Sequence, residues 1–144
     1  MSQSIKTKLN GLFKSHLDAT KTICDVTSTE ITTKEPFKYF IFNVNDCKIN
    51  ISSGCRQLNL NSCKNITIVT ERLPITGLYL TRTNNIKINI KGDDNGSGYL
   101  SIDKSVNGNI DSEQCCMVDV NNCISIKLNG KNISDRYVDS TWTC

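Results

Sequence analysis

The chain has 144 residues, with 17 Lys and Arg against 14 Asp and Glu, a formal net charge of +3 and eight cysteines. This length fits a single domain with its own hydrophobic core. The basic residues are scattered among acidic ones, which argues against the concentrated positive surface of a nucleic-acid-binding protein. Since no apolar run approaches the ~20 residues of a membrane-spanning helix, we expect no membrane partner.

The N-terminal residues are polar and basic, with apolar residues at helical spacing from Ile5 to Leu17. This pattern differs from a secretory leader and predicts a cytoplasmic protein, in which the cysteines are reduced thiols. It also predicts a short amphipathic helix over residues 4–18. We expect this helix to cover the N-terminal end of the fold, with partner or membrane binding as the alternative. The lone His16 is expected to be packed rather than to bind a metal.

The next residues divide the chain into two regions. Residues 22–36 are rich in Thr and Ser and read as a linker or an irregular first repeat. Residues 37–44 hold three of the four Phe residues and form the first expected strand. The predicted organisation is therefore an N-terminal helix and linker over residues 1–36 and a β domain over residues 37–144, whose tail after Asn129 loses the pattern.

A short phrase recurs within the β domain. It consists of Asn, Asp or Ser, often followed by Cys or Asn, and then Ile alternating with polar residues. The first Ile residues of successive phrases are Ile49, Ile66, Ile86 and Ile124, separated by 17, 20 and 38 residues. A period near 20 with strand-type alternation predicts an all-β, right-handed parallel β-helix, because one turn cannot bury its apolar face alone.

The same phrase predicts which side chains face the interior. We expect a buried set of isoleucines: Ile66, Ile68, Ile86, Ile88, Ile124 and Ile126. Cys47, Cys63 and Cys123 hold similar places in their phrases, which predicts a stacked ladder of buried thiols. Cys115 and Cys116 are adjacent, so in a strand they would face opposite sides.

The chain lacks the patterns typical of catalytic and metal sites. It has no Cys-x-x-Cys pair and one His, which argues against a zinc site and a Cys–His nucleophile. The loop over residues 92–98 lacks a phosphate-binding Gly-Lys-Ser/Thr ending, and the twelfth residue from Asp93 is Lys104 rather than the Glu of a calcium loop. We expect no enzyme activity, cofactor or metal, and we expect the long flat faces of a β-helix to bind macromolecules.

Three segments resemble motifs of the C-terminal actin-binding domain of adenylyl cyclase-associated proteins. Residues 61–65 (N-S-C-K-N) resemble the family's D-N-C-K-K turn, and residues 84–92 (N-N-I-K-I-N-I-K-G) resemble S-K-x-V-x-V-x-G. Residues 101–105 (S-I-D-K-S) resemble S-I-[DN]-K-T, the most specific of the three. The resemblance covers about Phe37 to Gly130.

The resemblance implies a right-handed β-helix that binds monomeric actin and promotes exchange of ADP for ATP. It implies a cytoplasmic, cytoskeleton-associated protein, usually a homodimer that exchanges C-terminal strands. By analogy, the actin-binding residues are expected around Asp103 and Lys104, with Lys87 and Lys91 on the neighbouring turn. Tyr137 and Trp142 are expected to make dimer or tail contacts.

A second family supplies the alternative. Residues 55–60 (C-R-Q-L-N-L) resemble the A-C-Q-Q-x-R segment of tubulin-cofactor-C-type domains, which activate small GTPases. The arginine that neutralises transition-state charge in that family corresponds to Asn59, so the domain would regulate a GTPase without this finger. Arg72 and Arg82 are candidates for a displaced finger. A structural β-helix scaffold without catalytic partners is the third hypothesis.

Overall fold

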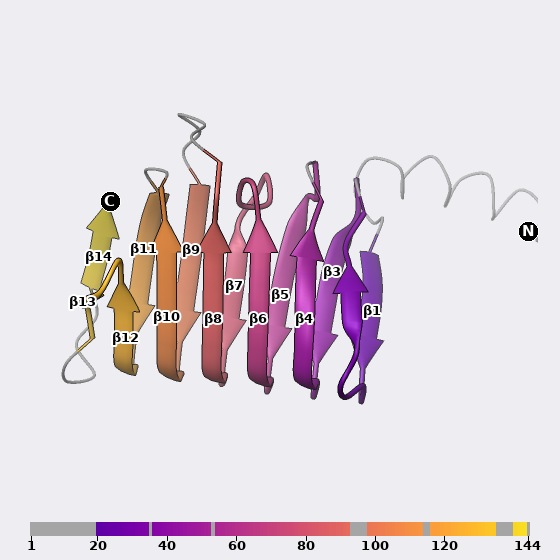
Figure 1. Cartoon of the computed structure of the whole chain (residues 1–144), viewed down its shortest axis with the longest axis horizontal. Helices are drawn as coiled ribbons and strands as arrows, with labels where there is room; N and C mark the ends of the chain where they lie inside the picture. The colour runs from indigo at the N-terminus through magenta and orange to yellow at the C-terminus, as the bar shows by residue number, and fades with distance from the viewer. Residues whose placement is uncertain are drawn as a thin grey trace, which may run out of the picture.

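The computed structural model describes residues 20–34, 36–52, 54–92, 98–113, 116–134 and 140–143. The strands alternate between two seven-stranded sheets, named sheet A and sheet B here (Figure 1). Sheet A contains β1 (Thr20–Cys24), β3 (Lys38–Phe42), β5 (Gln57–Asn61), β7 (Leu78–Thr81), β9 (Gly98–Asp103), β11 (Cys116–Asn121) and β14 (Ser140–Thr143). Sheet B contains β2 (Glu30–Thr32), β4 (Asn45–Ile51), β6 (Lys64–Thr70), β8 (Asn84–Ile90), β10 (Val106–Ser112), β12 (Ile124–Leu128) and β13 (Lys131–Asn132).

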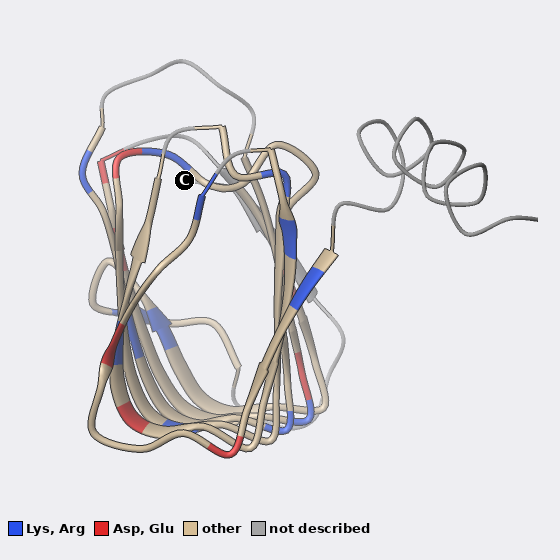
Figure 2. Ribbon diagram, turned by 90° about the vertical axis from the view of Figure 1, so that its right-hand side faces the viewer, with Lys and Arg blue, Asp and Glu red and all other residues tan. Residues whose placement is uncertain are grey.

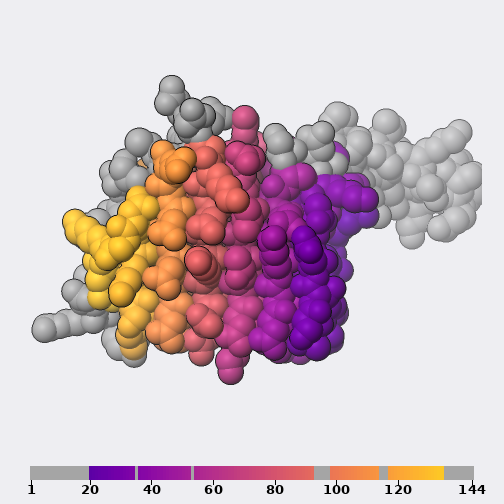
Figure 3. Space-filling view, in the orientation of Figure 1, coloured from indigo at the N-terminus to yellow at the C-terminus, as the bar shows by residue number. Residues whose placement is uncertain are grey.

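The chain winds as a right-handed parallel β-helix, as the repeat predicts. Residues paired between neighbouring sheet B strands are separated by 18, 19, 20, 22 and 18 residues, along the row Ile31, Ile49, Ile68, Ile88, Ile110 and Leu128. In Figure 1 the parallel strands of sheet B run upward in front and those of sheet A run downward behind, while the chain advances leftward. The space-filling view shows the turns packed in sequence order along the sheet B side (Figure 3).

Each passage from sheet A to sheet B is a corner built on two residues with left-handed backbone. Asn43 (φ 54) and Asp46 (φ 56) flank one corner, and Ser62 (φ 56) and Asn65 (φ 55) flank the next. Asn and Asp tolerate this conformation best among non-glycine residues, which explains why the recurring phrase contains them. The corners also stack: the Asn65 amide donates to Asp46 at 2.8 Å and the Asn85 amide donates to Asn65 at 2.8 Å.

The interior is a continuous apolar column between the two sheets. Of the six predicted interior isoleucines, Ile66, Ile68, Ile86, Ile88 and Ile126 are buried. Ile124 was predicted wrongly, because 37% of its surface is exposed. It pairs with Val106, whereas Ile126 pairs with Gly108 in the row of Ile86. Counting from the first Ile of each phrase therefore shifted this repeat by two residues.

Two of the three cysteines predicted to stack as buried thiols occupy equivalent positions in the structure. Cys63 and Cys123 lie between the two left-handed residues of their corners, and both are buried. Cys47 is also buried, but it lies inside β4 and pairs with Ile66, so it belongs to a strand row rather than to the corner. The corner row continues through residues of similar size: Val44, Cys63, Thr83, Ser105 and Cys123.

Both ends of the β-helix depart from the sequence-based outline. Of the two readings of residues 22–36, the structure favours the irregular first repeat over the linker, because β1 and β2 form a parallel first turn that begins by Thr20. At the other end, β13 pairs antiparallel with β12 and β14 antiparallel with β11, where no strands were predicted. The predicted helix over residues 4–18, with His16, lies outside the described residues. Among those that are described, no helix is long and apolar enough to cross a membrane.

Candidate binding surface

The outer faces of the two sheets differ in chemistry. On sheet B, one outward row runs from Lys48 through successive register partners: Thr67, Lys87, Asn109 and Lys127. On sheet A, the outward positions include several large apolar and aromatic residues: Phe40, Phe42, Tyr79, Tyr99 and Met117. The end-on view shows the sheets as two separate walls around the core, so the two surfaces face away from each other (Figure 2). The outward surface of sheet A is called the aromatic face below.

Two tyrosines at the centre of the aromatic face are fixed in place. The rings of Tyr79 and Tyr99 meet edge to face, with centroids 5.7 Å apart. The Tyr79 hydroxyl donates to the Thr76 carbonyl at 2.9 Å, and the Tyr99 hydroxyl donates to the Asp119 carboxylate at 2.5 Å. The bond to Asp119 raises the pKa of Tyr99. A side chain at Gly77 (φ +122) would meet both rings at 3.1 Å, so glycine lets them lie close to the backbone.

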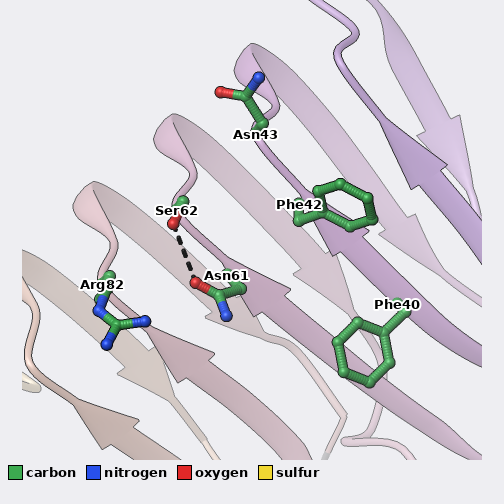
Figure 4. A pocket seen from close by; sticks show the side chains of 6 residues that line it. All are labelled: Phe40, Phe42, Asn43, Asn61, Ser62 and Arg82. Atoms are coloured by element: carbon green, nitrogen blue, oxygen red, sulfur yellow. Dashed lines mark hydrogen bonds between the residues drawn. The ribbon is translucent and has the colours of Figure 1, made fainter.

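A groove lies at the edge of the aromatic face, beside the corners. It has a volume of about 520 Å³ and is lined by Phe40, Phe42, Asn43, Asn61, Ser62 and Arg82. Figure 4 shows these side chains on successive turns, with the phenylalanines at one end and Arg82 at the other. The Ser62 hydroxyl donates to the Asn61 side-chain oxygen at 2.9 Å (Figure 4). We call this hollow the corner groove.

The structure separates the four residues that the actin-binding resemblance selected. Asp103 ends β9 on the aromatic face, and Lys104 follows it at the corner (φ 51). Lys87 is exposed on the outer face of sheet B, in the middle of β8. Lys91 follows the last residue of β8, about 20 Å along the strand direction from the corner. Asp103 and Lys104 therefore share one edge, which Lys87 and Lys91 do not reach.

The two predicted tail contacts are placed only in part. Tyr137 lies outside the described residues. Trp142 lies in β14, where it is paired with Val118 of β11 in the same chain.

The positions considered for an arginine finger differ in their surroundings and in whether their side chains already have interaction partners. Asn59 lies at the centre of the aromatic face, paired with Phe40 on one side and Tyr79 on the other. Arg56 and Arg72 both have interaction partners. Within the part of the chain that the structure describes, the exposed guanidinium of Arg82 has no hydrogen-bond or ion-pair partner. Arg82 is therefore the guanidinium best placed to meet an anionic group from outside.

The buried thiols are poorly suited to nucleophilic chemistry. Burial raises the pKa of Cys55, Cys63 and Cys123, which disfavours the reactive thiolate. In the described ranges, no group of three or more His, Cys, Asp or Glu side chains is arranged to hold a metal ion.

Sequence reasoning missed the corner groove, although its signal was present. In the strand over residues 38–42, Tyr39 and Ile41 are buried, and Phe40 and Phe42 alternate with them. This alternation puts both phenylalanines outside, 47% and 39% exposed.

No protein-family model, curated protein or solved structure was found to match the chain.

Proposed function

We propose that the chain is a protein-binding module that binds monomeric actin through the aromatic face. In this proposal it favours an actin state from which ADP leaves faster, so that it promotes nucleotide exchange without covalent chemistry of its own. The observation that carries the proposal is the contrast between the two outer faces. Aromatic residues, Met and Arg are enriched at the cores of protein interfaces, whereas Lys is depleted there.

Two further observations support this choice of surface. Asp103 and Lys104, from the segment that most specifically resembles the actin-binding family, lie at the edge of the aromatic face. The face is also preformed, because its strands are paired in parallel register on a fully packed core. A preformed surface of this kind loses little conformational entropy on binding a partner.

The experiment is the release of fluorescent ADP from monomeric actin, with and without the chain at micromolar concentration. We expect faster release with the wild-type chain, and a smaller acceleration with Lys104→Glu. Lys87→Glu is the matched control, because it makes the same charge change on the outer face of sheet B. Unchanged release with the wild-type chain would contradict the exchange function. Equal losses for the two variants would contradict the assignment of the surface.

Regulation of a small GTPase is the second candidate, and Arg82 is the observation that favours it. The Arg82 guanidinium is exposed and has no partner among the residues that the structure describes, and a guanidinium of this kind can stabilise charge in phosphoryl transfer. The test is GTP hydrolysis by purified small GTPases in the presence of the chain. We expect any acceleration to disappear in Arg82→Asn, and acceleration that survives this change would exclude Arg82 as the finger.

A further inference from the structure

The apolar wall of the corner groove consists of two outward-facing rings on one strand. Phe40 and Phe42 are 47% and 39% exposed, although both lie in a well-paired strand. On the neighbouring strand they face Asn59 and Asn61, so no apolar side chain there covers them. An exposed aromatic pair beside polar groups is typical of a binding pocket rather than of a solvated surface.

The unused polar groups of the corner groove are mainly N–H donors. The oxygen of the Asn61 side chain accepts from Ser62 at 2.9 Å, while its amide nitrogen has no partner among the described residues. The Arg82 guanidinium is likewise without a partner in that part of the chain. The Asn43 side-chain amide donates to the Asp25 carboxylate on the preceding turn, so the Asn43 side-chain oxygen remains as a hydrogen-bond acceptor. Arg82 and Asn61 together match an anionic acceptor.

Arg82 has a left-handed backbone conformation, which is unusual for a long cationic side chain. The equivalent corner positions are Asp25, Asn43, Ser62 and Asn122, all short polar residues suited to left-handed backbone. Arg82 (φ 51) and Lys104 (φ 51) depart from this pattern on consecutive turns. A residue held in an unfavourable conformation points to a role beyond folding, and only Arg82 of this pair lines the groove.

We propose that the corner groove binds an extended acidic segment of the partner protein. One carboxylate of this segment accepts hydrogen bonds from the Arg82 guanidinium and the Asn61 amide, and a neighbouring aliphatic or aromatic side chain packs on Phe40 and Phe42. Charge-assisted bonds to arginine supply direction and specificity, and ring contacts supply buried apolar area. This inference rests on the proposed protein-binding function and names the chemistry that one part of the partner presents.

The test begins with random heptapeptides displayed on phage and selected on the immobilised full chain. We expect enriched peptides to carry Asp or Glu next to Leu, Ile, Phe or Trp. Synthetic copies are then measured by fluorescence anisotropy against Arg82→Asn, Phe40→Thr and Lys87→Asn. Arg82→Asn is expected to fold, because Asn already occupies the equivalent corner positions 43 and 122. Lys87→Asn also removes one exposed positive charge, but on the outer face of sheet B, away from the groove.

Arg82→Asn and Phe40→Thr are each expected to weaken peptide binding by about tenfold or more, as loss of a charged hydrogen bond or a ring contact implies. Lys87→Asn is expected to change it by less than about twofold, since an exposed charge outside the site contributes little. Replacing the peptide's acids by Asn or Gln should match the loss seen with Arg82→Asn. Equal effects of Arg82→Asn and Lys87→Asn, or no enrichment over the Arg82→Asn chain, would overturn the proposal.

The same variants separate this inference from the proposed function. Actin binding that is unchanged in Arg82→Asn, together with failed peptide selection, would overturn the groove assignment and leave the actin proposal standing. Peptide binding that depends on Arg82, in a chain that does not bind actin, would support the groove and overturn the actin proposal.

Discussion

At the scale of single residues, position within the repeat determines how much a side chain contributes to stability. Ile88 and Ile124 are the same residue type in equivalent strands of sheet B, yet Ile88 is buried and Ile124 is 37% exposed. Ile88→Ala is expected to cost about 2–5 kcal/mol in unfolding free energy, because a cavity forms in the packed column. Ile124→Ala is expected to cost less than about 1 kcal/mol. Urea unfolding measures both, and equal losses would contradict the observed register.

The corner thiols give the protein a pH dependence of defined sign. Burial raises the pKa of Cys63 above its ordinary value of 9.0, and it raises that of Cys123 as well. The unfolded chain therefore loses these protons at lower pH than the folded chain does. Their contribution to stability is complete below about pH 9 and is lost as the pH rises from there toward the folded pKa values.

The matched control replaces both thiols by serine. Ser105 already occupies this ladder and donates to the Asp103 carbonyl at 2.9 Å, as Cys63 does to Asn61 at 3.4 Å. We expect the double variant to fold and to lose less stability than the wild type between pH 8 and about pH 10.5, a window set by the ordinary thiol pKa. Identical pH profiles from thermal unfolding would show that the thiols do not titrate differently on unfolding.

At the scale of elements, the ends of the coil protect its sheet edges. β14 pairs antiparallel with β11, and β13 with β12, while Ile133 and Ser134 are buried beside them. At the other end, Lys21 of β1 is paired with buried Tyr39, and its ammonium group lies 4.5 Å from the centre of the Phe37 ring. The end strands β13 and β14 have only 2 and 4 residues, and short edge strands and an edge charge both hinder pairing with another chain.

Removing the C-terminal strands tests their role. A chain that ends at Gly130 loses β13 and β14 and leaves the edges of β11 and β12 unpaired. We expect concentration-dependent association and a lower melting temperature, measured by size-exclusion chromatography and calorimetry. Ile133→Ala is the control, since it removes buried apolar area but keeps both strands. A truncated chain that stays monomeric and melts like the wild type would show that these strands are dispensable.

The sequence predicted the coil because its repeat combines two local signals. Alternating Ile residues indicate strands, and Asn or Asp before them indicates left-handed corners, such as those at Asn43 and Asn65. The phase of the first and last repeats was wrong: Ile49 pairs with Ile68 rather than Ile66, and Ile124 is exposed whereas Ile126 is buried. The alternation of Phe40 and Phe42 with buried residues could have predicted the apolar wall of the groove. Its polar wall could not be predicted, since it depends on which residues of separate turns come into register, such as Phe42 and Asn61.

At the scale of the whole molecule, the fold separates two surfaces of different chemistry on one rigid core. A parallel β-helix presents each row of side chains at a strand spacing of about 4.8 Å. Because the buried core lies between the two faces, we expect a substitution on one face to leave the other unchanged. The aromatic face carries Tyr79 and Tyr99, while the sheet B face carries Lys48 and Lys87. This separation allows the binding surface to be tested with paired variants of one chain.

The most direct measurement is the affinity for fluorescently labelled monomeric actin of the wild-type chain, Tyr79→Lys and Val69→Lys. Tyr79 lies on the aromatic face, and Val69 lies on the outer face of sheet B between Asn50 and Asn89. If the aromatic face binds actin, Tyr79→Lys weakens binding by about tenfold or more, as expected for a central aromatic contact, and Val69→Lys leaves it nearly unchanged. Absence of wild-type binding, or equal losses in the two variants, would contradict the proposal.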